Sequence, residues 1–301
     1  MVIKRISPFI LGLFLVQSAL AQVGQTGLAF LKLGVGGRAL GMGEAYSAIA
    51  SDATATYYNP ASLTLSHNSQ LVLMHKEWIQ DTRTEFLAAK TSFDNVSVGM
   101  SINSTSTSDI EIRETPGPAL GTFASHDAAI GISGALQIDP ALSIGVTGKY
   151  LYEKILVNEA SGTAFDFGAW YQTPWNIRLA AAVNNVGSMN ELEHESSTLP
   201  TIIRVGGAYE RALEGFDGSL TLSSDVVSVT GEGKAHLNVG GELNYKNSFT
   251  IRAGYQDGYE ARSITAGVGF HYGAFQVDYA FLPTRNDLGS THTFSLGIDF
   301  N

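Results

Sequence analysis

The C-terminal stretch Thr293-Phe-Ser-Leu-Gly-Ile-Asp-Phe300 alternates with a strict period of two. Its apolar parity consists of Phe294, Leu296, Ile298 and Phe300, and small or polar residues occupy the other parity. A membrane-spanning β-strand has this pattern over about ten residues, because one face contacts lipid and the other faces the barrel lumen. The stretch therefore predicts a strand that is apolar on one face only.

The same alternation recurs back along the chain. It predicts further strands at 275–281, 264–272, 249–255, 235–245, 218–227, 200–210, 176–185, 163–172, 141–152, 127–138, 95–103, 82–92 and 69–78. The two strands nearest the N-terminus are the least regular, because Lys76 and Lys90 interrupt their parity. The total of about 14 is even, as in bacterial outer-membrane barrels. We expect an all-β fold, a transmembrane antiparallel β-barrel.

The connections between the predicted strands differ in length on the two sides of the barrel. Even-to-odd connections are short, such as Asp94-Asn95 and Lys246-Asn247, with 212–217 as a longer exception. Odd-to-even connections are longer and more polar, such as 104–124, 153–162 and 186–199. Short turns on the periplasmic side and long loops outside are typical of outer-membrane barrels, so both termini are expected in the periplasm.

Charged side chains fall on the small and polar parity. They are Lys149, Asp166, Arg178, Arg204, Asp225, Glu242, Arg252, Asp278 and Asp299. An Arg or Lys on the lipid face costs about 2–4 kcal/mol at the bilayer midplane, so these groups are expected to face the lumen. The leading interpretation is that they fill the lumen as mutually paired charges, and the alternative is that some line a substrate pathway.

The N-terminus has the features of a secretory signal peptide. Lys4 and Arg5 precede the apolar stretch 6–16, and Ala19-Leu20-Ala21 predicts cleavage before Gln22. An uncleaved membrane anchor is the alternative, but about 20 apolar residues are needed to span a bilayer as a helix. No later apolar run approaches that length. We therefore expect a signal peptide at 1–21, a non-alternating hatch or plug at 22–66 and the barrel at 67–301, located in the outer membrane of a Gram-negative bacterium.

Composition and local patterns argue against an enzyme. The chain has no Cys and a formal net charge of −10, which exclude thiol chemistry and disfavour nucleic acid as a partner. Ser125-His126-Asp127 are adjacent in sequence, and neighbours along a strand point apart, so they cannot form a catalytic relay. His75 and His292 are the only candidates for a hydrolase site on the lipid face. No cofactor or metal site is expected.

Residues 22–66 are rich in glycine and alanine and do not alternate. Gly34-Val-Gly36 is not followed by the third glycine of a nucleotide-binding loop or by a P-loop lysine. Asn59 followed by Pro60 predicts an N-cap and the first residue of a short helical turn, and Asp52 is a candidate cap for the Ala-rich stretch. The candidate hatch residues are Gly36, Gly37, Arg38, Gly41, Gly43, Asp52, Asn59 and Pro60. Phe300, an aromatic residue closing the last strand, is the candidate assembly signal.

Residues 30–46 and 52–63 resemble the N-terminal signature of the PorV/PorQ family of outer-membrane proteins. The pieces 184–187, 199–209, 252–255, 277–281 and 288–297 are similar to the same family in the same order. The resemblance implies a fourteen-stranded barrel whose lumen holds the N-terminal segment as a hatch. Glu44 departs from the family's usual Gly-Met-Gly-Gly.

The resemblance implies two functions. The family is related to FadL-type transporters, which implies passive transport of small hydrophobic compounds through a lumen gated by residues 22–66. Some members belong to the type IX secretion system, which implies the alternative of binding cargo or secretion proteins. A purely structural outer-membrane protein is a third possibility. The expected partners are outer-membrane lipid, the barrel assembly machinery, and either hydrophobic small molecules or secretion proteins.

Overall fold

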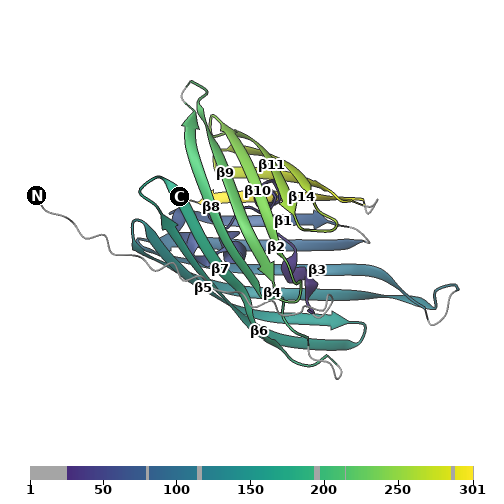
Figure 1. The fold of residues 1–301 in the computed structure, drawn as a ribbon. Coiled ribbons are helices and arrows are strands. Elements are labelled where there is room, and N and C mark those ends of the chain that lie inside the picture. Colours follow the sequence, from purple (N-terminus) through teal and green to yellow (C-terminus); the bar gives the residue numbers. More distant parts are fainter. Residues whose placement is uncertain are drawn as a thin grey trace, which may run out of the picture.

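The structure is a computed structural model that describes residues 26–78, 81–113, 117–192, 197–213, 215–285 and 289–300. The predicted signal peptide, its cleavage site and Asn301 lie outside these residues. The described part of the chain forms one closed antiparallel barrel of fourteen strands, in which sequence neighbours pair and β1 closes on β14 (Figure 1). The strands are β1 (Ser69–Glu77), β2 (Thr82–Phe93), β3 (Val96–Ile112), β4 (Gly121–Asp139), β5 (Leu142–Ile155), β6 (Asn158–Gln172), β7 (Ile177–Met189), β8 (Ile202–Leu213), β9 (Gly218–Val229), β10 (Ala235–Tyr245), β11 (Phe249–Asp257), β12 (Ile264–Tyr272), β13 (Phe275–Pro283) and β14 (Ser290–Phe300). The predicted fold class is confirmed.

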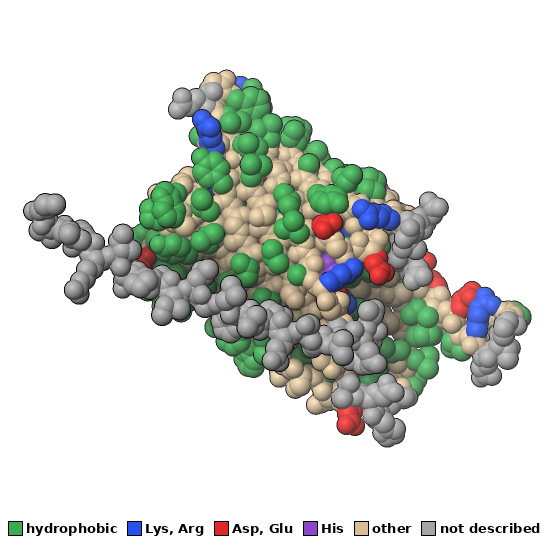
Figure 2. Space-filling view, in the orientation of Figure 1, with side chains coloured by type: hydrophobic (Ala, Val, Ile, Leu, Met, Phe, Trp, Pro, Cys, Tyr) green, Lys and Arg blue, Asp and Glu red, His purple; other side chains and the backbone are tan. Residues whose placement is uncertain are grey.

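The apolar residues of the alternating pattern face the outside of the barrel wall, and the small or polar residues face the lumen. On β12, Ile264 and Phe270 are 62% and 54% exposed, whereas Thr265 between them in the chain is buried. Apolar side chains cover much of the outer wall (Figure 2). This exposed apolar surface is what a lipid-facing barrel wall requires.

Several strands are longer than the sequence pattern predicts. β3 extends to Ile112 and β4 begins at Gly121, so most of the predicted loop 104–124 is strand, and the hairpin projects past the ends of β1 and β2 (Figure 1). The predicted loop 153–162 is also wrong, because only residues 156–157 connect β5 to β6. The outward-facing side chains there are polar, as at Ser104 and Lys154, so backbone pairing continues after the apolar signal ends.

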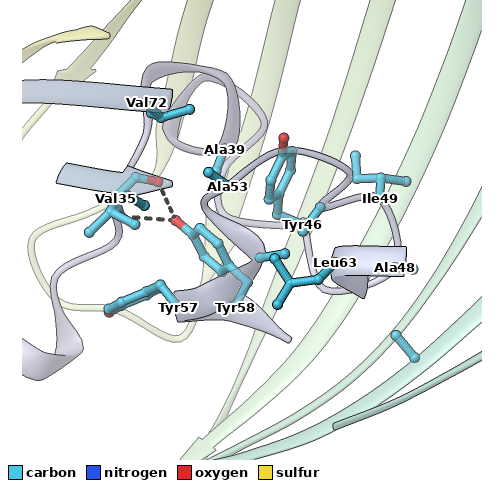
Figure 3. Packing of buried hydrophobic residues seen from close by; sticks show 14 of the residues in the cluster. Val35, Ala39, Tyr46, Ala48, Ile49, Ala53, Tyr57, Tyr58, Leu63 and Val72 are labelled. Atoms are coloured by element: carbon cyan, nitrogen blue, oxygen red, sulfur yellow. Dashed lines mark hydrogen bonds between the residues drawn. The ribbon is translucent and has the colours of Figure 1, made fainter. Parts of the chain in front are cut away.

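Residues 26–66, called the plug segment below, lie inside the barrel. They contain four short helices: η1 (Ala29–Lys32), α1 (Gly37–Gly41), α2 (Ala55–Tyr58) and η2 (Pro60–Leu65). Tyr46 and Tyr58 are fully buried and their rings meet edge to face at 5.3 Å. The Tyr58 hydroxyl donates to the Val35 carbonyl at 2.9 Å and accepts from its N–H at 3.0 Å (Figure 3). The plug segment therefore has a small apolar core of its own, which packs against the wall.

The plug segment begins near the loop end of the barrel, the end away from Phe300. Thr26 bridges Thr198 in the β7–β8 loop, and the Gly27 N–H donates to the Thr198 carbonyl at 3.1 Å. From there the chain crosses the lumen and enters β1 at the turn end, where Ser69 pairs with Phe300. The loop lengths predict that the loop end is extracellular, and the plug segment runs from this end towards the turn end.

Glycines in the wall allow the plug backbone to approach closely. A Cβ on Gly240 would lie 2.3 Å from the Met42 carbonyl oxygen, and one on Gly254 would lie 2.2 Å from the Gly43 nitrogen. The neighbouring Gly241 faces outward, and a Cβ there would lie 3.6 Å from the Leu222 side chain, an ordinary contact.

We expect Gly240→Ala to destabilise the protein by about 1–3 kcal/mol, because the added methyl overpacks the contact with the plug segment. Gly241→Ala is the matched control on the same strand and should change stability little. The urea midpoint of each variant in lipid vesicles measures the difference. Equal midpoints for the two variants would contradict the close packing of the plug segment on β10.

Candidate functional site

The wall holds the plug segment through buried polar side chains, beginning with Asp225 on β9. This carboxylate accepts hydrogen bonds from the backbone N–H of Tyr46 at 3.2 Å, from that of Ser47 at 2.9 Å and from the Ser47 hydroxyl at 2.9 Å. A carboxylate that accepts several such bonds in a dry site is strongly held. Asp225 therefore fixes the middle of the plug segment to the wall.

Lys76 and Lys90, which interrupt the parity of the first strands, both face the lumen and donate to the plug backbone. Lys76 Nζ donates to the Gly34 carbonyl at 2.9 Å. Lys90 Nζ donates to the carbonyls of Ser51, Leu63 and Ser66 at 3.0, 3.1 and 2.8 Å. In the sequence these lysines only interrupt the alternation of the first two strands. The signal that could have identified them is a lysine at a lumen-facing strand position in a barrel that contains a segment of irregular backbone.

Arg38 connects the plug segment to a chain of charges on the wall. Its guanidinium donates twice to the Glu242 carboxylate, at 2.9 and 2.8 Å. Glu242 also accepts from Arg252 at 2.6 Å, and Arg252 donates to Asp278 at 2.7 Å. Charges of both signs on β10, β11 and β13 thus form one network, with Arg38 of the plug segment at its end.

Glu44, the departure from the family pattern, forms a second ionic contact. Its backbone adopts φ 60°, the left-handed region that favours glycine. Its carboxylate accepts from Arg262 in the β11–β12 loop at 3.1 Å and from Gln256 at 3.4 Å. Glu44 thus forms its ion pair from a backbone conformation that glycine would adopt more easily.

The other candidate hatch residues have backbone roles. Gly36 and Gly43 have φ of 83° and 64°, and the Gly37 N–H donates to Ser295 at 2.7 Å. The structure brings Gly41 against Gly267 of β12, where an added Cβ would lie 3.1 Å from the Gly267 Cα. These positions let the plug segment turn sharply within the lumen.

One of the short helices of the plug segment has a side-chain cap. The Asn59 side chain accepts from the Ala61 N–H at 3.1 Å, with Pro60 as the first residue of η2, as the sequence predicts. Asp52 accepts from the Thr54 N–H at 3.0 Å, but α2 begins after Thr54 without a side-chain cap, so Asp52 does not cap a helix.

The remaining candidate lumen charges lie at three places. Lys149 pairs with Asp166 at 2.7 Å, Arg178 pairs with Glu210 at 2.6 Å, and Asp299 accepts from Gln70 at 2.9 Å. Phe300 ends β14 on the lipid face, and its role as an assembly signal stays a prediction.

Arg204 differs from the other candidate lumen charges. It is 3% exposed, and its guanidinium lies over the rings of Tyr57 and Tyr58, 6.0 and 5.3 Å from their centroids. These contacts are cation–π interactions with α2 of the plug segment. Arg204 thus contacts the plug segment through aromatic faces instead of a carboxylate.

A cavity of about 590 Å³ lies between the plug segment and the loop end of the barrel. Phe30 and Leu33 of the plug segment, Trp78, and Ile202 and Val229 of the wall form an apolar part of its lining. Polar and charged side chains form the rest, namely Lys32, Glu44, Thr82, Thr105, Thr107, Asp127, Arg204, Glu232, Tyr259, Glu260 and Arg262. A cavity that combines apolar surface with polar groups can hold a small molecule.

The candidate histidines for a lipid-face hydrolase lie on the outer wall. His75 contacts Glu85 at 2.6 Å. His292 lies 3.1 Å from the Ser290 hydroxyl and 2.8 Å from the Tyr279 hydroxyl. The two histidines form separate contacts. Within the described residues, no group of three or more His, Cys, Asp or Glu side chains is placed to hold a metal ion. None of the described helices has the length and apolar character to cross a membrane.

Together the closed barrel, its apolar outer wall and its polar-anchored plug segment define an outer-membrane β-barrel with an occluded lumen. The family model described as "Type IX secretion system protein PorV" matches residues 17–227. The chain belongs to this PorV family. No curated protein sequence matches the chain.

The fold is similar to that of solved outer-membrane channels. The CymD monoaromatic hydrocarbon channel aligns with TM-score 0.65 and 12% identity, covering 89% of this chain and 98% of that one. The Pseudomonas putida toluene transporter TodX aligns with TM-score 0.60 and 12% identity, covering 89% and 99%. A Pseudomonas aeruginosa FadL homologue aligns with TM-score 0.56 and 13% identity, covering 89% and 98%. The matched family and these structures are secretion-system and channel proteins.

We expect Lys90→Met to loosen the plug segment, because three carbonyls lose a charged donor in a buried site. Loss of a buried partner costs about 1–3 kcal/mol. Limited proteolysis of the purified barrel should cut the plug segment faster in this variant. Lys154→Met, which removes an exposed lysine on β5, is the control, and equal cleavage in both variants would contradict the anchoring role of Lys90.

Acid should release the extracellular start of the plug segment. Lys32 and His236 contact Glu232 at 3.1 and 2.9 Å. Burial raises the pKa of Glu232, but the hydrogen bonds from His236 and Lys32 outweigh it and hold the pKa below its ordinary value. A lowered carboxyl pKa contributes stability above the unfolded value of about 4.3 and loses it as the pH falls through the folded value.

The protection of residues 28–33 against hydrogen exchange, relative to the intrinsic rate at each pH, should therefore fall below about pH 4. Glu232→Gln should have lower protection at neutral pH and lose this acid dependence. An acid-induced loss of protection of the same size in the variant would assign the effect to another group.

Proposed function

We propose that this chain is a passive outer-membrane conduit for small hydrophobic compounds, in which the plug segment occludes the lumen. The observation that carries the proposal is the cavity at the loop end of the barrel, which the plug segment lines with Phe30 and Leu33. A compound that enters from this end meets these apolar side chains together with the Lys32–Glu232 ion pair. The fold shared with hydrocarbon channels supports this function.

Passage requires the plug segment to shift. The short helices and turns of the plug segment hold it together internally, and Asp225, Lys90 and the Arg38–Glu242 pair bind it to the wall. Water entering with the ligand can replace these partners one at a time. An apolar ligand can replace the apolar contacts of Phe30 and Leu33 directly. Binding in the cavity then favours the displaced plug.

Deleting residues 24–60 should raise conductance in planar bilayers, because the deletion removes most of the segment that fills the lumen. Unchanged conductance in a correctly folded deletion variant would count against a gating plug.

A reversible lock gives a sharper test than the deletion. The hydroxyls of Thr64 on η2 and Ser143 on β5 are 2.8 Å apart, and the chain has no native cysteine. Thr64→Cys with Ser143→Cys should form a disulfide that ties η2 to the wall. Uptake of a small aromatic hydrocarbon by vesicles should fall on oxidation and recover on reduction, with each single variant as control. Equal uptake in the two redox states would contradict movement of η2 during passage.

A second candidate function is binding of secretion-system proteins or their cargo. The family description supports it, and the β3–β4 hairpin offers strand surface beyond the lipid-facing wall. Affinity purification from native outer membranes should then recover secretion components together with the barrel. Recovery of the barrel alone would count against this role.

A further inference from the structure

Three polar side chains lie together on the lumen face of β3, β4 and β5, at the level of the extracellular cavity. Asp127 on β4 is directly opposite Thr105 on β3 and Glu153 on β5. Asn103 lies two residues from Thr105 on the same face of β3. Asp127 lines the cavity itself. Asn103, Asp127 and Glu153 are called the wall cluster below.

Asn103 and Glu153 of the wall cluster are buried, Asp127 is half-buried, and each of the three has a buried polar atom without a protein partner among the described residues. Asn103 and Glu153 are 4% and 7% exposed. Both side-chain atoms of Asn103, one carboxylate oxygen of Asp127 and one of Glu153 are buried with no hydrogen bond among the described residues. Buried polar atoms in folded proteins nearly always have partners, so a group of unsatisfied atoms on three adjacent strands needs an explanation.

The two carboxylates also lack a counter-charge. Like charges directly opposite on neighbouring strands disfavour each other. Of the lumen cations, Lys149 is engaged by Asp166 and Asn185, and Arg204 lies over Tyr57 and Tyr58. Neither Asp127 nor Glu153 forms an ion pair with a described residue. The wall cluster is a place for a positively charged group that the protein does not supply.

The surroundings indicate which kind of cation fits. A bound Ca²⁺ takes six to eight oxygen ligands, more than the wall cluster offers. An ammonium group has three donors, which matches the acceptors of Asn103, Asp127 and Glu153. The adjoining cavity is lined by Phe30 and Trp78, which suit an apolar body attached to that ammonium group.

We infer that the wall cluster binds the ammonium group of a small amphiphilic amine whose apolar body occupies the extracellular cavity. This inference rests on the proposed function, because it treats the cavity as the entrance of the conduit. It narrows the substrate class from hydrophobic compounds in general to those that carry a cationic amine.

Titration calorimetry on the full barrel purified in detergent tests the inference with three probes of one shape: 2-phenylethylamine, 2-phenylethanol and phenylacetate. At neutral pH the amine should bind at least tenfold more tightly than the alcohol, and phenylacetate most weakly. Asp127→Asn and Glu153→Gln should abolish the preference for the amine. Glu159→Gln, which alters an exposed carboxylate on β6, should leave the preference intact.

Equal binding of amine and alcohol, or a preference that survives both variants, would overturn the inference. If calcium alone bound to the wild-type barrel and displaced the amine completely, the wall cluster would be a metal site and the inference would be wrong. A readout without variants is carbodiimide-activated coupling in the wild-type barrel, in which the amine attacks the activated carboxylate and the urea leaves. The bound 2-phenylethylamine should attach to Asp127 or Glu153 faster than to the exposed Glu159, and equal attachment counts against the site. Binding in detergent needs no flux, so failure of the hydrocarbon uptake test leaves the amine preference measurable, and the reverse also holds.

Discussion

Backbone N–H and C=O groups at membrane depth need partners inside the protein, because the hydrocarbon core of the bilayer offers none. The wall meets this need by itself, since the pairing of β1 with β14 leaves no open edge. The plug segment cannot do so, because its short helices and turns satisfy only part of its backbone. Its remaining groups depend on side chains of the wall, among them Lys90, Asp225 and Trp170, whose indole donates to the Ala48 carbonyl at 3.0 Å.

The same requirement explains why the lumen is both polar and lined with glycine. A polar side chain reaches the plug backbone only where the plug lies close to the wall. At Gly168 an added Cβ would lie 3.0 Å from the Pro60 side chain, and at Gly145 it would lie 2.5 Å from the Ala61 nitrogen. Along the lumen face, small residues therefore let the plug segment approach the wall, and polar residues bind its backbone. Opening the lumen means exchanging these partners for water, so gating and hydration are coupled.

The sequence predicts the wall better than the plug, for a physical reason. Lipid enforces parity along each strand, so the regular alternation ending at Phe300 predicts a strand without knowledge of its neighbours. Partners of the plug segment depend on which strands become adjacent in space. Lys76 and Lys90 therefore looked like errors in a pattern, and the contact of Glu44 with Arg262 could not be located from spacing.

Two other features escaped prediction for related reasons. Above the lipid the outer face needs no apolar residues, so the extension of β3 to Ile112 lost its periodic signal while its backbone pairing continued. The wall cluster depends on register: Asp127 and Glu153 are far apart in the chain and become neighbours only because β4 pairs with β5 in that alignment. Neither residue was a candidate site residue in the sequence, where Asp127 was considered only as part of Ser125-His126-Asp127.

The plug segment is held differently at its two ends, and this difference bears on how a ligand could move it. Its later part, beyond Gly36, has directional contacts to strands around the barrel, such as those of Arg38 with β10, Ser47 with β9 and Thr64 with β5. Its start, residues 28–33, packs in an apolar cluster with Leu151, Ala164 and Met189 of β5, β6 and β7. Apolar packing has no required direction, so an apolar molecule can substitute for it, whereas a hydrogen bond needs a matching group. The part of the plug segment that a hydrophobic ligand can displace is therefore the part that forms the floor of the cavity.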